Sequence, residues 1–154
     1  MIDRRDRGRQ WLKAGGILSL IAAALHVACI FGGGDWYRFF GAGEELARAD
    51  EAGSWIPALM TAGIATILAI WALYAFSGAG LMARLPLLRT ALIVIAAIYL
   101  TRGLLLLPSL YIPEARTPFN IWSSLIVLAY GITYAVGTWL RWGTISSLVR
   151  KEIT

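Results

Sequence analysis

Arg102 stands inside an apolar run, residues 87–107, that is long enough to cross a bilayer. A charge within a membrane span costs about 2.5–3.5 kcal/mol on insertion scales, so it usually faces a partner or water. The position of Arg102 therefore predicts a polar site around it. The alternative is that Arg102, near the outer end of the run, extends its guanidinium to the lipid headgroups unaided.

Four acids are expected on the same side of the membrane as Arg102: Asp35, Glu44, Glu45 and Glu114. We expect its partner to be Glu44 or Glu45, because Gly41 and Gly43 would let that connection fold back over the mouth of the bundle. The alternative is that these acids are solvated and help to keep the connection outside.

His26 is the one histidine of the chain and falls within the first apolar span, in the same half of the bilayer as Arg102. An imidazole there can carry a proton or contact a ligand. The alternative is a neutral ring bonded to a carbonyl of a neighbouring helix. A single histidine and a single cysteine argue against haem or structural zinc, and no cofactor is expected.

Aromatic residues surround these polar groups. Tyr99 lies one turn from Arg102 on the same helix face, and Trp36 and Tyr37 follow the first span. Together with Trp55 and Trp122 they would line an aromatic pocket, although aromatic residues are also common at membrane interfaces without any ligand. The predicted ligand-binding set is His26, Arg102, Glu44, Glu45, Tyr99, Trp36 and Tyr37.

The composition indicates a membrane protein. Of 154 residues, 58% are hydrophobic and 15% are charged, and a soluble domain of this size cannot bury so much apolar surface. The net charge is +5, and the basic residues stand at the ends of the apolar spans. This pattern indicates topology signals and contacts with anionic lipid, not a nucleic-acid surface.

Four apolar spans are expected in a single domain of residues 1–154: residues 14–33, 55–76, 87–107 and 121–140. We predict an all-α integral membrane bundle of four antiparallel transmembrane helices. Its outer loop is expected to be partly helical, with a short helix over residues 44–51.

Small residues mark the faces on which the helices are expected to pack. In the second span they recur at a 4-3-4-3 spacing: Ala58, Ala62, Ala65, Ala69 and Ala72. Such a face lets helices approach closely. We expect Leu68 to lie off this face and to meet lipid. In the fourth span, Gly131 and Ala135 form a second small-residue pair.

Lysine and arginine are concentrated in the N-terminal segment, in the connection with Arg84 and Arg89, and in the C-terminal tail. The positive-inside rule then predicts cytoplasmic termini, and we expect a bacterial inner membrane. The first span is expected to be retained, because His26 stands where a lipoprotein cleavage site would need an aliphatic residue. The tryptophans agree with this topology: Trp36, Trp55 and Trp122 fall at the outer interface, and Trp11, Trp139 and Trp142 at the inner one.

The leading functional hypothesis is a protein that binds an amphipathic or lipid-like small molecule in a pocket open to the outer leaflet. The alternative is a structural or accessory subunit of a homo-oligomer or of a larger membrane complex. A membrane enzyme with His26 as acid or base ranks third, because the chain has no GxSxG, HExxH, phosphate-binding glycine loop or CxxC motif. Membrane lipids are expected partners, and nucleic acid is not.

Overall fold

The computed structural model describes residues 3–113 and 116–145 of the chain. Its main helices are α1 (Arg4–Phe39), α2 (Glu44–Glu51), α3 (Ile56–Ala79), α4 (Leu88–Leu104), α5 (Leu106–Tyr111) and α6 (Pro118–Leu140). Four stretches are long and apolar enough to cross a membrane: Arg4–Phe39, Ile56–Ala79, Leu88–Pro108 and Pro118–Leu140. The protein is an all-α integral membrane bundle, as the sequence predicts.

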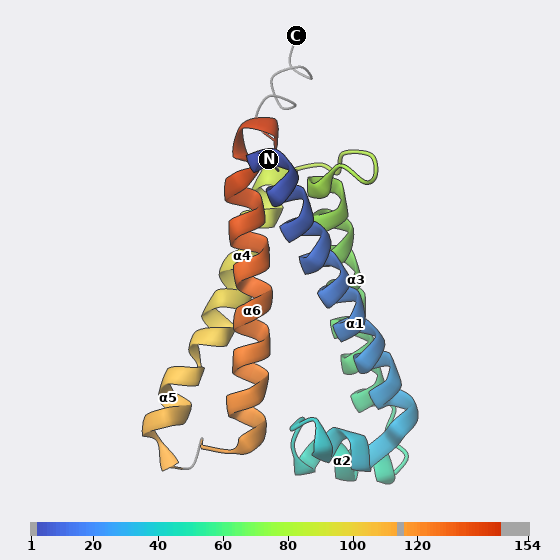
Figure 1. Ribbon diagram of the computed structural model, residues 1–154. Helices are drawn as coiled ribbons and strands as arrows, with labels where there is room; N and C mark the ends of the chain where they lie inside the picture. The colour runs from blue at the N-terminus through green and yellow to red at the C-terminus, as the bar shows by residue number, and fades with distance from the viewer. Residues whose placement is uncertain (1–2, 114–115, 146–154) are drawn as a thin grey trace.

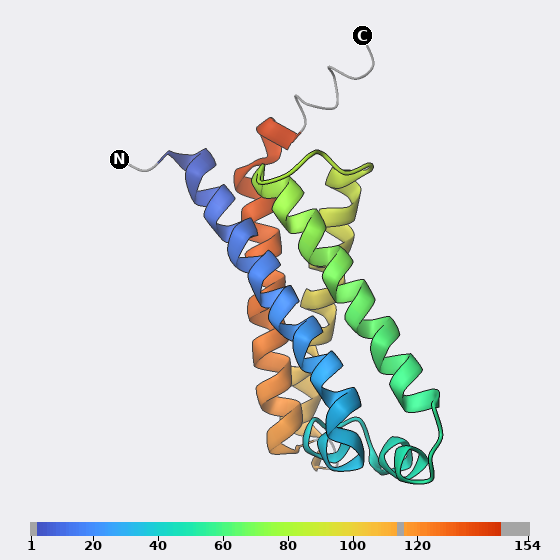
Figure 2. The ribbon, with the colours of Figure 1, turned by 90° about the vertical axis from the view of Figure 1, so that its right-hand side faces the viewer.

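The bundle consists of two helix pairs. α1 packs along α3, α4 packs along α6, and contacts between α1 and α6 join the two pairs. The pairs come together at the end where α1 begins and α6 ends, which we call the terminal end (Figure 1). They diverge toward the opposite end, where α2 lies, which we call the α2 end. The view at right angles shows the spanning helices running between these two ends, with the short α2 across the lower end (Figure 2).

α1 is longer than the predicted span at both ends. The basic segment before residue 14 is helical and packs on the end of α6, where Leu12 is fully buried. Gly137 allows this contact, because an added Cβ there would lie 2.9 Å from the backbone nitrogen of Leu12. At the other end the helix kinks at Gly33, whose φ of 66° suits glycine, and then continues to Phe39.

The third span is interrupted and also runs past its predicted boundary. α4 ends at Leu104, and α5 carries the helical run on to Tyr111. α5 accepts Pro108 because this residue lies in its first turn, where a missing N–H costs no helical hydrogen bond. α6 begins three residues earlier than predicted, because the Thr117 hydroxyl caps it by accepting the N–H of Asn120 at 3.1 Å.

The small-residue face of α3 is an internal packing surface, since Ala65 and Ala72 are buried. The prediction that Leu68 meets lipid is wrong, because its side chain is only 8% exposed. The buried stripe runs through Thr61, Ala65, Leu68, Ala72 and Ala75. Leu68 is three residues after Ala65 and four before Ala72, so the helical repeat places it on the same face.

Glycines bring α4 and α6 close together. An added Cβ at Gly131 would lie 2.9 Å from the backbone nitrogen of Leu100, and one at Gly103 would lie 2.6 Å from the Cα of Leu128. Van der Waals contact between close backbones is a main source of helix association in lipid. Both contacts lie between residues 100–103 of α4 and 128–131 of α6, so the two helices approach most closely there.

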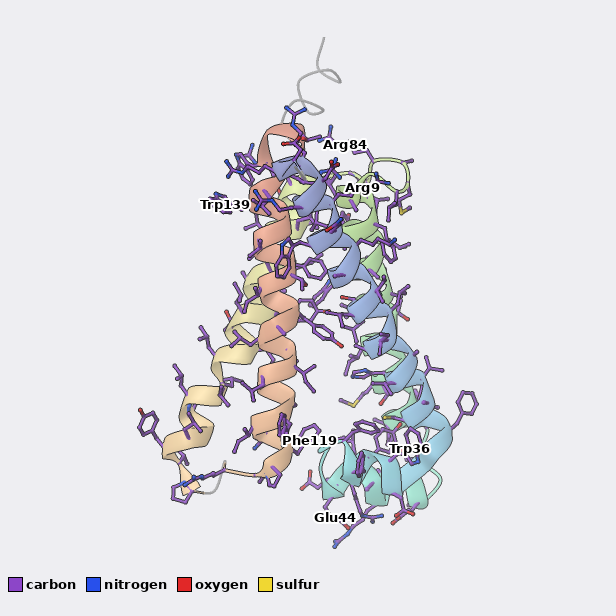
Figure 3. The ribbon with its side chains drawn as sticks, viewed as in Figure 1. Arg9, Trp36, Glu44, Arg84, Phe119 and Trp139 are labelled. Atoms are coloured by element: carbon purple, nitrogen blue, oxygen red, sulfur yellow. The ribbon has the colours of Figure 1, made fainter. Side chains whose placement is uncertain are left out.

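Side chains divide between the two ends much as the tryptophan pattern predicts. Trp139 lies at the terminal end, together with Arg9 and Arg84, whereas Trp36 lies at the α2 end beside Glu44 (Figure 3). Phe119, from the start of α6, reaches the turn at Gly41, where its ring occupies the space of an added Cβ. This contact bridges the helix pairs at the end where they are otherwise apart.

Candidate functional site

The predicted site around Arg102 does not form as expected. Arg102 donates a hydrogen bond from Nη1 to Oγ of Ser124 on α6, at 3.1 Å. Within the described residues it makes no ion pair with a carboxylate, so the predicted pairing with Glu44 or Glu45 is wrong. Glu114, the remaining loop acid on the α4–α6 side, lies outside the described residues.

The acids of the outer connection are used by nearby arginines. Arg38 donates from Nε to Glu44 at 2.8 Å and from Nη1 to Glu51 at 2.5 Å, while Arg48 donates to Glu44 at 2.9 Å. Asp35 lies 3.4 Å from Arg38. We call these five residues the α2 clasp. The clasp joins α2 to the last turns of α1, so its acids lie on the α1–α3 pair. Arg102 lies on α4, in the other pair.

The α2 clasp also sets the protonation of its acids. The hydrogen bonds from Arg38 and Arg48 lower the pKa of Glu44 from 4.5 to about 2, and the hydrogen bond from Arg38 lowers the pKa of Glu51. Both carboxylates are thus ionised at neutral pH. These ion pairs connect α2 to α1, and Glu45 beside them is exposed to solvent.

His26 is half-buried, and its Nδ1 lies 2.7 Å from the carbonyl oxygen of Ala22. The imidazole is therefore bonded within its own helix and not to a neighbouring one. This contact fixes the ring orientation and leaves Nε2 as the nitrogen that can still meet another group.

The three predicted aromatic residues lie in three different surroundings. Tyr99 is only 5% exposed, inside the main core. Tyr37 is buried at the α2 end, where its hydroxyl accepts a hydrogen bond from Thr61 at 3.4 Å. Trp36 is partly exposed and packs on Phe40. No single pocket brings these side chains together among the described residues.

Tyr99 instead takes part in a buried polar contact that connects all four spanning helices. The Ser19 hydroxyl lies 3.0 Å from the Tyr99 hydroxyl and 2.9 Å from that of Tyr134. The Tyr134 hydroxyl also lies 3.0 Å from the carbonyl oxygen of Trp71, whose ring meets Tyr99 edge-on. We call these four residues the tyrosine cluster, and its mutual hydrogen bonds indicate a structural role.

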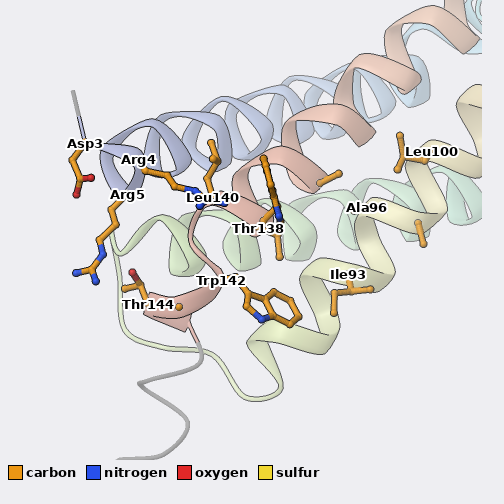
Figure 4. A pocket seen from close by; sticks show the side chains of 14 residues that line it. Asp3, Arg4, Arg5, Ile93, Ala96, Leu100, Thr138, Leu140, Trp142 and Thr144 are labelled. Carbon is orange, nitrogen blue, oxygen red and sulfur yellow. The ribbon is translucent and has the colours of Figure 1, made fainter. Parts of the chain in front are cut away.

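A large hollow opens at the terminal end, between α4, α6 and the first turn of α1. Its volume is about 950 Å³, within the range of small-molecule sites. We call it the α4–α6 groove (Figure 4). It is lined by Asp3, Arg4, Arg5, Ile93, Ala96, Ala97, Leu100, Ala135, Thr138, Trp139, Leu140, Trp142, Gly143 and Thr144.

The groove has a chemical polarity along its length. Its deeper wall is aliphatic and comes from α4, with Ile93, Ala97 and Leu100. Its mouth is cationic and aromatic. The guanidinium carbon of Arg4 lies 4.8 Å from the centre of the Trp139 ring, and that of Arg89 lies 3.5 Å from the centre of the Trp142 ring. An apolar trough that ends in arginines is suited to an amphipathic molecule.

Thr138 adds a hydrogen-bonding group to the wall of the groove. Its side chain is 5% exposed, and its hydroxyl has no hydrogen-bond partner among the described residues. Buried hydroxyls are normally bonded, so an unpaired one beside a hollow is informative. A smaller hollow of about 410 Å³ follows along α4, lined by Thr101, Arg102 and Leu105 among others, and it shares Ala97 with the groove.

The groove combines an apolar wall with cationic groups, an arrangement suited to binding. Among the described residues no cluster of three or more histidine, cysteine or acidic side chains lies together. The acid of the groove is Asp3, and His26 lies elsewhere on α1.

The sequence pattern did not reveal the groove, because its arginines and tryptophans have other common roles at membrane interfaces and Thr138 stands out in no motif. Arg4 and Arg5 were expected to be topology signals, and Trp139 and Trp142 interfacial anchors. The signal that could have found it is the helical continuation of the first span into the basic segment. That continuation brings Arg4 beside the end of the fourth span.

Comparisons of the chain with protein-family models, curated proteins and solved structures find no match.

Proposed function

We propose that this membrane protein binds an amphipathic, lipid-like small molecule in the α4–α6 groove. The observation that carries the proposal is the groove itself, about 950 Å³ of space with an aliphatic wall and two arginines at its mouth. Burial of an aliphatic tail against the wall is favourable because it removes apolar surface from water, and a polar head can contact the guanidinium groups. The site thus differs in place from the outer-leaflet pocket expected from Arg102.

Two other functions have less support. The small-residue face of α3, which favoured an accessory subunit, packs inside the chain at Ala65 and Ala72. The enzyme hypothesis relied on His26, whose described hydrogen bond goes to the carbonyl oxygen of Ala22 and not to an acid or a nucleophile.

We further propose that the protein resides in a bacterial inner membrane with both ends in the cytoplasm, so the groove would open toward the inner leaflet. The excess of arginine at the terminal end supports this orientation. In a Cys29→Ala background, an impermeant maleimide should label Ala52→Cys in intact cells and Met82→Cys only after lysis. Both positions are exposed. The reverse pattern would overturn the orientation.

Native mass spectrometry of the protein extracted in mild detergent tests the binding function. We expect retained molecules of lipid mass, and we expect Ala97→Phe, which adds a ring to the groove wall, to reduce their amount several-fold. The matched control is Ala129→Phe on an exposed face of α6, outside both hollows. Equal retention by the two variants would refute binding in the groove.

A further inference from the structure

In the part of the chain that the structure describes, the arginines at the mouth of the groove form no ion pair with a carboxylate. Arg4 and Arg5 line the groove, and Arg89 lies on the ring of Trp142 beside it. Within the described residues, every ion pair belongs to the α2 clasp at the opposite end. Among the described residues that line the groove, Asp3 is the one acid against Arg4 and Arg5, so positive charge is in excess there.

The hydroxyl of Thr138 gives a second polar contact, separate from the arginines. It stands in the last turn of α6, on the wall of the groove, and it is buried without a partner among the described residues. Arg4 extends along the groove toward Leu140, while Thr138 lies farther in (Figure 4). The groove therefore presents a charged contact at its mouth and a neutral one deeper, before its aliphatic wall.

We infer that the occupant of the groove is an acidic glycerophospholipid; this inference rests on the proposed binding function. Its phosphate would meet Arg4 and Arg5, because arginine matches the oxygens of a phosphate with two parallel hydrogen bonds. An ester or glycerol oxygen would meet the hydroxyl of Thr138. An acyl chain would then lie along Ile93, Ala97 and Leu100.

The order of contacts favours this class over other anionic amphiphiles. A fatty acid carries its polar atoms in one carboxylate, so it cannot satisfy the arginines and the deeper hydroxyl together. A free phosphate ion leaves the aliphatic wall unused. A glycerophospholipid has a phosphate, then ester oxygens, then hydrocarbon, in the same sequence as the groups of the groove.

Lipid binding by the purified full-length protein tests the charged contact. Detergent-solubilised protein is titrated with phosphatidylglycerol, with phosphatidylcholine and with oleate, and occupancy is read by native mass spectrometry. We expect phosphatidylglycerol to bind best, and Arg4→Gln combined with Arg5→Gln to weaken it about tenfold, since two charge-assisted contacts are lost. Arg116→Gln, in an exposed connection, is the matched control.

The neutral contact has its own variant. Thr138→Val keeps the shape of the side chain and removes the hydroxyl, so it should weaken phosphatidylglycerol binding about threefold or more. The same variant should leave the melting temperature of the lipid-free protein unchanged or raise it, because no hydrogen bond is lost there. Thr66→Val, whose hydroxyl bonds to its own helix on an exposed face of α3, is the control.

The possible outcomes distinguish failure of the phospholipid assignment from failure of the proposed binding function. If phosphatidylglycerol, phosphatidylcholine and oleate bind equally and Ala97→Phe blocks all three, the groove binds amphiphiles and the phospholipid assignment fails. Competition by inorganic phosphate as strong as that by lipid would also overturn it, as would a Thr138→Val variant with normal affinity. If Ala97→Phe blocks none of the lipids, both proposals fail.

Discussion

The two ends of the bundle use arginine in opposite ways. At the α2 end, Arg38 is held by Glu44, Glu51 and Asp35, and α2 closes over them. At the terminal end, Arg4 and Arg89 lie on the rings of Trp139 and Trp142 without a described carboxylate partner. At the α2 end the positive charge of arginine is therefore balanced by carboxylates of the same chain. At the terminal end the positive charge remains available to a group outside the protein.

The hydrophobic clusters also differ in size between the two ends. The main core draws on all four spanning helices and includes Leu12, Leu88 and Leu92 near the terminal end. The α2 end has a much smaller cluster of Cys29, Tyr37 and Ala47, with Phe40 against it. The groove therefore lies at the end with the larger core, whereas the α2 end combines a small apolar cluster with polar contacts. A large core and arginines without a described carboxylate partner therefore occur at the same end of the bundle, which supports the groove as the proposed binding site.

The largest loss of stability should follow a substitution in the main core, because this core joins the helix pairs. Leu68→Ala is expected to cost about 2–5 kcal/mol, the usual range for a buried leucine. Leu73→Ala, at a side chain that is 44% exposed and faces away from the core, should cost far less. Thermal unfolding in detergent measures both. Equal losses would mean that Leu68 does not serve as a core residue.

The next largest loss of stability is expected for Tyr134→Phe. This variant removes one hydroxyl from the tyrosine cluster and leaves Ser19 with Tyr99 as its one partner in the cluster. Loss of these bonds at a buried site is expected to cost about 1–2 kcal/mol. The control is Tyr111→Phe, since Tyr111 is almost fully exposed. The cluster would be dispensable if Tyr134→Phe melted with the wild-type protein.

The sequence predicts the fold well and the site poorly, for a physical reason. Span length and hydropathy depend on local composition, so four helices and the helix at residues 44–51 are visible in the sequence. The partner of Arg102 depends on which pair of helices carries which loop. α2 folds back onto α1 through Arg38, and a pattern of charges along one chain does not encode that choice. Leu68 gives a second example, because the spacing of the alanines alone does not show that this leucine shares their buried face.

The α2 clasp should respond to acid, in a direction set by its lowered carboxylate pKa values. Because the pKa of folded Glu44 is about 2 and its ordinary value is 4.5, docking of α2 is fully supported above about pH 4.5 and is lost as the pH falls toward 2. Spin labels at Glu45→Cys and Met60→Cys, in a Cys29→Ala background, would report a narrow distance distribution that broadens in acid.

Arg38→Gln provides the matched test of that response. Without the guanidinium, the same distance distribution should already be broad at pH 7. Docking of α2 that persists unchanged at pH 2, or in the Arg38→Gln variant, would show that hydrophobic packing around Tyr37 and Ala47 holds α2 and that the clasp is incidental.

The smallest effect is expected at Arg102, although this residue is the most conspicuous charge in the sequence. Arg102 is exposed as a whole residue, and the described partner of its guanidinium is the buried hydroxyl of Ser124. An exposed arginine near the end of a span reaches headgroups and water, so Arg102→Gln should cost no more than about 1 kcal/mol and should leave phosphatidylglycerol affinity unchanged. Thermal unfolding and the lipid titration measure the two quantities. A loss of about 3–5 kcal/mol, typical of breaking a buried ion pair, would show that Arg102 is paired with an acidic side chain and is not simply solvated.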